Sequence, residues 1–465
     1  MLLPQSFEDQ IKPLLKDEWD IFADALSTEA PVSIRLNPAK GKLFSPKLTN
    51  VGWCSIGFYL EKRPSFTFDP LFHAGTYYVQ EASSMFVEQA VKQHLEGDVR
   101  FLDLCAAPGG KSSHIISLLS PNSLLVSNEV IRSRSEVLAE NMTKTGYPNI
   151  IVTSNDPSEI GRKMTDYFDA ILVDAPCSGE GMFRKDKNAI EEWSPANVQL
   201  CKERQQRILA DVWAALKPGG LLIYSTCTFN KEENEENILW ICDKLGAKTL
   251  SVKTNPEWNI SPAYQEYDIP CYHFFPHKTK GEGLFLAVLR KDGTITQSIS
   301  SLNLKSKKGK NSEKKSVLAP EHKAYLRDSD SYHFFAKGNN WFAFPKSLYP
   351  DFEYVTSHMY LISAGICMGE YKGKDFIPHQ SLALSIALND TVFQSYEVDK
   401  PTAIAYLRKE ALSLPDIAKG YILLTFQGIP LGFVKNIGNR ANNLYPQDWR
   451  IRSGHIPENT ENPLL

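Results

Sequence analysis

Short runs of apolar residues alternate with segments of helical spacing through the middle of the chain. Helical stretches separate most of the runs, notably 197–216. Alternation of this kind predicts an α/β fold, a doubly wound sheet over residues 73–292. The runs that are typical of buried strands cover 100–105, 123–129, 149–154, 169–175, 220–226 and 284–290.

The flanking regions follow other patterns. Apolar residues from Phe7 to Leu15 stand at helical spacing and predict an amphipathic helical segment over residues 1–30. The strand-like pieces SIRLN and GFYLE follow, so we expect residues 1–72 to form a small α+β N-terminal domain. Residues 319–465 contain short strand signals such as YILLTF and PLGFVK, and they predict a small β-rich domain that folds by itself.

A segment of different composition precedes the last region. Residues 293–318 are rich in Ser, Asn and Gly, and six lysines fall between Lys305 and Lys315. This composition is typical of a flexible linker, and its lysines could also touch RNA phosphates. The two interpretations are compatible.

The bulk composition excludes some classes of protein. Of 465 residues, 42% are hydrophobic and 23% are charged, which argues against wholesale disorder. A net charge of −3 argues against a histone-like binder, although local basic clusters still suit nucleic acid. Neither a signal peptide nor a membrane-spanning run is recognisable, and the eight cysteines lack zinc-ligand spacing. We therefore expect a cytoplasmic, reduced protein without metal or membrane contact, most simply a monomer.

The sequence KEENEENILWICDKLG after Asn230 predicts a further helix. Asn230 is expected to be its N-cap, and Glu233, three residues later, would complete a capping box. We interpret the acidic run as a solvated face, since acids near a helix N-terminus also suit the helix dipole.

The segment LDLCAAPGGKSSH, 102–114, is the strongest local motif. An apolar strand runs into small residues and then a helix, so a ligand can approach the backbone and the free N–H groups. An ordinary tight turn could look the same, but Glu129 ends the next strand 19 residues after Gly110, as a ribose-binding acid would. The GxGxxG fingerprint of nicotinamide cofactors is absent. The expected cofactor-binding residues, which also include acids closing two later strands, are Cys105, Ala106, Ala107, Pro108, Gly109, Gly110, Lys111, Glu129, Asp156 and Asp174.

Two cysteines follow the fourth and fifth predicted strands and should emerge at the same sheet edge. Cys177 lies in DAPCSGEGMFRKD and Cys227 in YSTCTFNKEEN. This arrangement suits 5-methylation of a pyrimidine, because carbon 5 of cytosine is a poor nucleophile. A thiolate that adds to carbon 6 creates an enamine whose carbon 5 can attack a methyl sulfonium. A base must then remove the carbon-5 proton before the thiol is eliminated.

Cationic neighbours would help a cysteine to ionise. Lys111, Arg184 and Lys185 are candidates for this role. Asp174 could hydrogen-bond the cytosine amino group or share a proton with ring nitrogen 3. Cys105 is interpreted as a structural part of the cofactor loop, and five other cysteines are interpreted as small buried hydrophobes: Cys54, Cys201, Cys242, Cys271 and Cys367.

These motifs resemble a known family. DAPCSGEGMFRKD and STCT, behind LCAAPGGKS, are similar to the RNA 5-methylcytosine methyltransferases of the Nol/Nop/Sun group, over residues 73–291. The ending LGFVKNIGNRANNLYPQDWRIR is similar to the PUA-like RNA-binding module of its bacterial ribosomal RNA members of the RsmF (YebU) type. The resemblance implies a Rossmann-like class I S-adenosylmethionine methyltransferase core. It also implies that Cys227 is the nucleophile, that Cys177 promotes product release, and that 105–111, Glu129, Asp156 and Asp174 line the cofactor site.

Three alternatives remain open at this point. DNA cytosine-5 methyltransferases attack with a Pro-Cys cysteine, which would make Cys177 the nucleophile, although the Thr226-Cys227 context favours the RNA pattern. Transfer RNA is an alternative to the expected substrate, a cytosine in 16S ribosomal RNA. The alternative from another functional class is a non-catalytic RNA-binding protein that assists ribosome assembly.

Basic residues near aromatic ones are candidate RNA contacts. Arg184 and Lys185 follow the catalytic loop and could hold nucleotides beside the target base. We interpret His273 and His277 as structural or RNA-facing, because neither has metal-ligand partners at sensible spacing. The expected partner is small-subunit ribosomal RNA or the 30S particle, bound also through the N-terminal domain and the basic end of the chain: Lys435, Arg440, Arg450 and Arg452.

Overall fold

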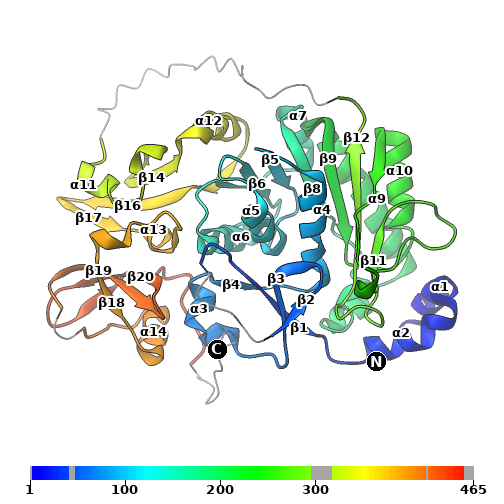
Figure 1. Ribbon diagram of the computed structural model, residues 1–465, viewed down its shortest axis with the longest axis horizontal. Coiled ribbons are helices and arrows are strands. Elements are labelled where there is room, and N and C mark those ends of the chain that lie inside the picture. The colour runs from blue at the N-terminus through cyan, green and yellow to red at the C-terminus, as the bar shows by residue number, and fades with distance from the viewer. Residues whose placement is uncertain (1–2, 41–47, 295–316, 415–416, 455–465) are drawn as a thin grey trace.

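Four β-sheets organise the computed structural model, which describes residues 3–40, 48–294, 317–414 and 417–454 (Figure 1). The six lysines of the expected linker lie outside these residues. Within the described ranges, no helix combines the length and apolarity needed to span a bilayer.

The central sheet confirms the predicted α/β fold, with strand order β10-β12-β9-β8-β5-β6-β7-β15 and β11 paired to β12. All six predicted apolar runs form strands of this sheet. Five of the strands run parallel and place their carboxyl ends at one edge: β5 (Arg100–Asp103), β6 (Leu124–Asn128), β7 (Ile150–Thr153), β8 (Phe168–Asp174) and β9 (Leu216–Thr226). The antiparallel strands are β10 (Ala247–Leu250), β11 (Tyr272–Phe274), β12 (Leu284–Lys291) and β15 (Leu361–Ala364).

Alternate residues of the central strands face two separate apolar cores, so both faces of the sheet are buried. Leu102 and Ile171 belong to one core, while Phe101 and Leu172 belong to the other. The first face is covered by α7 (Pro157–Lys163), α9 (Pro195–Val212) and α10 (Glu235–Leu245). The second is covered by α4 (Val87–His94), α5 (Gly110–Leu118) and α6 (Arg132–Thr145).

The helix predicted after Asn230 differs from expectation. Asn230 Oδ1 accepts a hydrogen bond from the Glu233 amide at 2.8 Å, but 231–234 form a turn and α10 begins at Glu235. The solvated acidic face is also wrong for Glu233 and Glu235, which are both fully buried. Burial is tolerated because Gln205 donates to Glu233 at 2.6 Å and His273 pairs with Glu235 at 2.8 Å.

The N-terminal region has the expected mixed character. Its helices α1 (Gln5–Leu15) and α2 (Trp19–Leu26) pack by aromatic contacts, with Phe22 5.1 Å from Phe229 between ring centroids. SIRLN and GFYLE lie in two adjacent strands of a four-stranded sheet. This sheet has the order β2 (Thr49–Val51), β3 (Cys54–Leu60), β1 (Val32–Leu36) and β4 (Tyr77–Val79).

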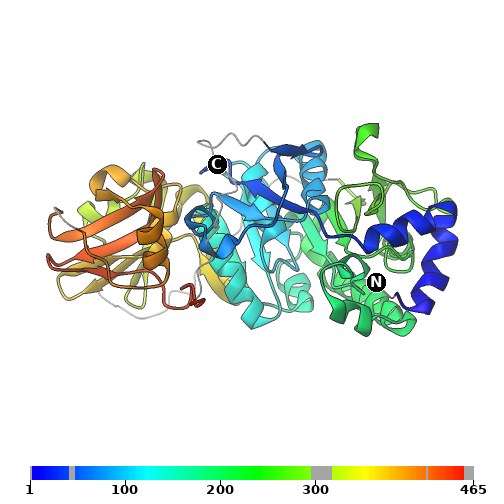
Figure 2. The same ribbon diagram turned by 90° about the horizontal axis from the view of Figure 1, so that it is seen from below.

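The C-terminal region is β-rich, as predicted, and lies beside the core in both views (Figures 1 and 2). One sheet contains β13 (Tyr332–Lys337), β14 (Asn340–Pro345), β16 (Ile366–Lys372) and β17 (Asp375–Pro378). The other contains β18 (Gln394–Glu397), β19 (Gly420–Phe426), β20 (Ile429–Asn436) and β21 (Ala441–Asn443). The prediction that this region folds by itself is wrong for part of it. Strand β15 joins the central sheet, and Phe344, Phe352 and Val355 enter the core of that sheet.

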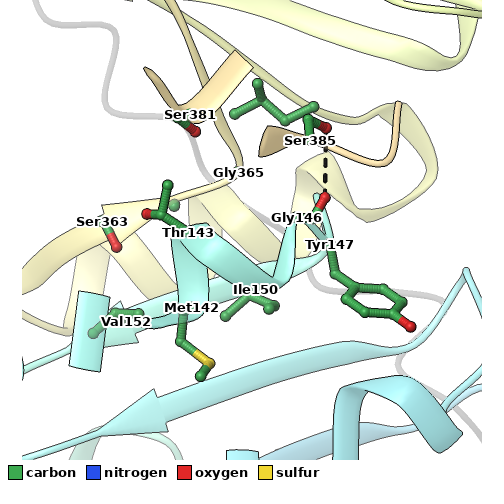
Figure 3. A pocket seen from close by; sticks show the side chains of 12 residues that line it. Met142, Thr143, Gly146, Tyr147, Ile150, Val152, Ser363, Gly365, Ser381 and Ser385 are labelled. Atoms are coloured by element: carbon green, nitrogen blue, oxygen red, sulfur yellow. Dashed lines mark hydrogen bonds between the residues drawn. The ribbon is translucent and has the colours of Figure 1, made fainter. Parts of the chain in front are cut away.

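A seam joins α6 and β7 to the C-terminal region (Figure 3). Ser385 Oγ donates to the Gly146 carbonyl at 3.4 Å, and Gly146 has a φ of 82° at the end of α6. A Cβ on Gly146 would lie 2.3 Å from the Leu384 carbonyl oxygen, so only glycine permits this close approach. The cavity at the seam measures about 20 Å³, which is room for roughly one water molecule.

Candidate active site

The loop between β5 and α5 holds the predicted cofactor-binding motif at the carboxyl edge of the sheet. Gly109 has a φ of 114°, a left-handed conformation that glycine adopts readily. Side chains of α6 support the loop: Asn141 donates to the Pro108 carbonyl at 2.7 Å and Arg134 donates to the Ala107 carbonyl at 3.0 Å. No side chain caps the N-terminus of α5, so its first N–H groups remain available to a ligand.

The three acids predicted to line the site lie at or just after the ends of β6, β7 and β8. Glu129 is buried and accepts a hydrogen bond from the Ile131 amide at 3.0 Å. Asp156 is exposed and caps α7, and its hydrogen bonds from Ser158 lower the pKa of its carboxyl. Asp174 is the last residue of β8, three residues before Cys177.

Asp174 and Lys111 form an ion pair between the cofactor loop and the end of β8. Lys111 Nζ donates to Asp174 Oδ2 at 2.8 Å, while Ser225 donates to Oδ1 at 2.7 Å. Burial lowers the pKa of Lys111, but attraction to Asp174, Asp103 and Cys227 raises it overall. The lysine therefore stays a cation near Cys227, as the sequence hypothesis for thiolate formation requires.

The two predicted cysteines meet. Pairing of Asp174 with Ser225 across β8 and β9 brings their loops together, and Cys177 Sγ lies 2.9 Å from Cys227 Sγ. The Cys227 amide also donates to Cys177 Sγ at 3.3 Å. The contact with the Cys227 sulfur, together with burial, raises the pKa of Cys177 well above its usual value. Cys177 therefore remains a thiol near neutral pH and can donate to the Cys227 sulfur.

Two buried glutamates clamp the cysteine loops; sequence reasoning missed Glu180 and gave Glu233 only a capping role. Glu180, on the Cys177 loop, accepts from the Phe229 amide at 2.6 Å on the Cys227 loop. Glu233, on the Cys227 loop, accepts from the Ser178 amide at 3.1 Å on the Cys177 loop. Each loop thus carries an acid that binds the other loop, which holds the two sulfurs in place. Both acids can be read from the motifs, but the sequence does not show that each side chain points to the other loop.

A further acid, Asp103, closes β5 directly beneath the cofactor loop. Ser112 donates to its Oδ2 at 2.6 Å, and Oδ1 has no partner in the described structure. Burial, reinforced by the nearby charge of Asp174, raises the pKa of Asp103 to about 7. An acid inside a buried strand was the available signal, and the sequence interpretation did not use it.

A cleft of about 1030 Å³ opens between the N-terminal sheet and the catalytic loops. Arg184 and Lys185 line it, but Arg184 donates to the Gly281 carbonyl at 2.9 Å and Lys185 pairs with Glu282. The structure thus engages both predicted RNA contacts within the protein. Exposed cations that the sequence did not single out line the same cleft: Lys62, Arg63 and Lys280.

The four predicted RNA contacts near the chain end do not share one environment. Arg440 and Arg452 are exposed, and Arg450 is half-buried. Lys435 pairs with Asp375. The aromatic residue Tyr445 is fully buried and therefore cannot stack on a base.

His273 has neighbours that sequence spacing did not reveal. Its Nε2 lies 2.8 Å from Glu235 Oε1, and Cys271 is close enough for the three to form a possible ligand set. A second buried set comprises Cys54, Glu88 and His114, with His114 Nε2 2.9 Å from its glutamate. Each histidine is already hydrogen-bonded to a carboxylate, so we interpret both sets as buried acid–imidazole pairs. The absence of a metal stays a prediction.

Solved structures of related fold support the architecture. A methyltransferase homologue from Pyrococcus horikoshii is 28% identical, with a TM-score of 0.52 over 62% of this chain and 95% of the homologue. NSun6 from Pyrococcus horikoshii with SFG is 21% identical, with a TM-score of 0.53 over 63% of this chain and 99% of that one. The second likeness shows the fold alone.

Family comparisons cover all three regions of the chain. The model of 16S rRNA methyltransferase RsmB/F matches 91–290, that of the N-terminal domain of RsmF matches 3–82, and that of the RsmF PUA domain matches 393–451. A Ribosomal RNA small subunit methyltransferase F from Enterobacter sp. (strain 638) is 30% identical over 98% of this chain and 97% of its own length. One from Cronobacter sakazakii is 30% identical over 97% of each chain. The chain therefore belongs to the ribosomal RNA small subunit methyltransferase F family, with a Rossmann-like methyltransferase core, an RsmF N-terminal domain and a C-terminal PUA domain.

Proposed function

We propose that the protein transfers a methyl group from S-adenosylmethionine to carbon 5 of a cytosine in 16S ribosomal RNA, through a covalent adduct between Cys227 and carbon 6. One observation carries the proposal: two cysteine sulfurs lie 2.9 Å apart at the sheet edge that also holds the cofactor loop. Family membership makes the protein a ribosomal RNA methyltransferase, and S-adenosylmethionine is the methyl donor of this class.

The carboxyl edge fits this donor. The uncapped N-terminus of α5 suits the carboxylate of the methionine part, and Glu129 suits the ribose hydroxyls. Asp156, on the next strand end, faces the solvent where an adenine would lie. When bound there, S-adenosylmethionine supplies an electrophilic methyl group.

Cys227 is the attacking residue in this proposal. Its thiolate adds to carbon 6, and the carbon 5–carbon 6 π electrons move so that carbon 5 becomes nucleophilic and takes the methyl group. The Lys111 cation supports the thiolate, and Asp174, fixed by Ser225, suits the cytosine amino group or ring nitrogen 3. A base then takes the carbon-5 proton, the carbon 6–sulfur bond breaks, and Cys227 leaves as a thiolate.

Cys177 assists that departure. Its raised pKa keeps it protonated, so its S–H can donate to the sulfur of Cys227 as negative charge returns there. The same property opposes the alternative in which Cys177 attacks, because the thiolate is the nucleophile.

We also propose that the RNA lies in the cleft beside Arg184 and Lys185 and reaches the PUA-like domain.

The PUA-like domain would contribute the cations predicted there. The order of domains that we propose is 1–72 for the N-terminal RNA-binding domain, 73–292 for the methyltransferase domain, 293–318 for the linker and 319–465 for the PUA-like domain. Near the end of the PUA-like domain, the cations that we propose to contact RNA are Lys435, Arg440, Arg450 and Arg452.

The experiment is methyl transfer from labelled S-adenosylmethionine to purified RNA, with the product mapped by bisulfite sequencing. Naked 16S ribosomal RNA, 30S subunits and transfer RNA are the three substrates. We expect one cytosine of 16S ribosomal RNA to be methylated, and Cys227→Ala to abolish it. Methylation of transfer RNA alone would contradict the substrate, and no transfer to any substrate would favour an assembly factor.

A denaturing gel separates the roles of the cysteines. Cys177→Ala should accumulate a protein–RNA adduct, because attack survives while elimination slows. Cys227→Ala and the double variant should form none. An adduct with Cys227→Ala would reverse the assignment. Cys201→Ala is a matched control, since Cys201 is a buried cysteine outside the two loops.

A further inference from the structure

We propose that Tyr360, which belongs to the C-terminal region, forms one wall of the adenine site of the methyl donor. The inference rests on the proposed function only in placing the donor across the ends of β5, β6 and β7. It adds a residue that none of the cofactor motifs contains, from a segment more than 200 positions further along the chain than Asp156.

Sheet topology brings Tyr360 to this edge. Strand β15 pairs antiparallel with β7, and Leu361 lies opposite Thr153, the last residue of β7. Because the strands run in opposite directions, the beginning of β15 meets the carboxyl end of β7. Tyr360 therefore stands beside Ser154, two residues before Asp156. Ligands of doubly wound sheets bind outside this edge.

Hydrogen bonds fix the backbone of Tyr360 there. Its carbonyl accepts from the Ser154 amide at 3.1 Å, and its amide donates to Asn155 Oδ1 at 2.9 Å. Asn155 in turn donates its amide to Asn128 Oδ1 at 2.9 Å, and Asn128 Nδ2 donates to the Leu104 carbonyl at 3.2 Å. Both asparagines are buried. This relay ties Tyr360 to the ends of the three strands across which the donor is proposed to lie.

The side chain of Tyr360 is half exposed, and Arg132 lies over its ring. It is 51% exposed, and the Arg132 guanidinium carbon lies 5.2 Å from the ring centroid. The ring is thus next to the segment that follows Glu129, where Val130 and Ile131 are 55% and 49% exposed. Val130 and Ile131, which follow Glu129 directly, and Tyr360, which contacts Arg132, therefore all leave apolar surface exposed near the proposed ribose acid.

A flat purine matches this surface. Apolar side chains and an aromatic ring offer a base its stacking partners, and stacking tolerates the edge polarity of adenine. Base–aromatic stacking typically changes affinity by about 10-fold on alanine substitution. The geometry also gives β15 a role beyond packing, because it delivers a ligand-facing ring from the C-terminal region to the methyltransferase site.

Calorimetric titration of S-adenosylhomocysteine into the full chain tests the inference. We expect Tyr360→Ala to raise the Kd about 10-fold and Tyr360→Phe to bind like the unaltered protein, because the ring rather than the hydroxyl stacks. The KM for S-adenosylmethionine should rise in proportion, with kcat and the KM for RNA unchanged. Val392→Ala is the matched control, since Val392 is 42% exposed in the same region but lies in the η9 turn (Asp390–Val392) next to β18.

A second ligand tests which end of the donor the ring meets. Inhibition by 5′-methylthioadenosine, which keeps the adenine and lacks the amino-acid part, should weaken by the same factor in Tyr360→Ala. An unchanged Kd in Tyr360→Ala overturns the inference, as does a change in the KM for RNA alone. A lowered unfolding temperature with equal losses in Ala and Phe would show a structural role instead. Failure of the unaltered protein to bind S-adenosylhomocysteine would refute the proposed donor, independently of Tyr360.

Discussion

Replacement of Glu180 is the sharpest test of how the cysteine loops are held. The fully buried carboxylate accepts five hydrogen bonds. Oε2 takes the Thr228 hydroxyl at 2.6 Å and the amides of Phe229 and Asn230 at 2.6 and 3.0 Å. Oε1 takes the Trp193 indole at 3.0 Å and the Asn230 side-chain amide at 2.8 Å. Every partner is a donor, which suits a carboxylate.

Glu180→Gln keeps the size of the side chain but replaces one acceptor by a donor. With the amide oxygen at the Oε2 position, the new NH₂ group faces the donors of Trp193 and Asn230. Losing two buried bonds to a charged acceptor should lower the free energy of unfolding by about 2 to 4 kcal/mol, because Asn230 keeps its other acceptors. Glu180→Ala removes all five acceptor contacts and should cost more.

Urea unfolding measures the stability, and methyl transfer well below the unfolding midpoint measures the site. We expect Glu180→Gln to lower kcat at least about 10-fold while the KM for S-adenosylmethionine stays unchanged, since the clamp fixes Cys227 and not the donor loop. Glu192→Gln is the control, because Glu192 is exposed on the nearby α8 (Lys187–Glu192). Equal midpoints and equal kcat for the two variants would refute the clamp.

Three further predictions address pH, RNA and the seam. Burial raises the pKa of Asp103 from 3.8 to about 7, so folding disfavours its ionised form. The free energy of unfolding, relative to that of Asp103→Asn, should therefore fall by up to about 4 kcal/mol as pH rises from about 4 to 7. A difference between the two proteins in urea unfolding that does not change with pH would contradict this. Lys62→Glu with Lys280→Glu should raise the KM for RNA about 10-fold and reduce its salt dependence, unlike Lys337→Glu on β13. An unchanged salt slope would remove these cations from the RNA path. Gly146→Ala should destabilise the protein by about 1 to 3 kcal/mol in thermal unfolding, because its Cβ would meet a carbonyl oxygen at 2.3 Å. An unchanged unfolding temperature would show that the backbone at the seam shifts to accommodate the methyl group.

Much of the architecture and the central chemistry could be predicted from local patterns. The six apolar runs form strands because each buried strand of a doubly wound sheet needs a continuous apolar segment. The cofactor loop and both cysteines follow strand ends, and parallel strands place those ends at one edge. A shared sheet edge for Cys177 and Cys227 was therefore implied by the strand that each follows, while their contact depends on the pairing of β8 with β9.

Errors arose where a side chain's surroundings depend on distant segments. The acidic run after Asn230 has the spacing of a solvated helix, yet Glu233 and Glu235 point inward because Gln205 and His273 are there to receive them. The protein partners of Arg184 were likewise not visible in its motif, because Thr28 and Glu29, in the segment after α2, supply its acceptors. Helical spacing and local charge cannot distinguish these outcomes, since the partners lie tens of residues or more away.

The sequence by itself determined which motifs follow which strands along the chain and the chemical groups that they carry. Those are local properties, written in residue type and spacing. Only the tertiary structure decided that Glu180 and Glu233 clamp the cysteine loops and that β15 brings Tyr360 to the cofactor edge. Long-range pairing depends on the summed packing of both sheet faces, and no single stretch of sequence contains that sum.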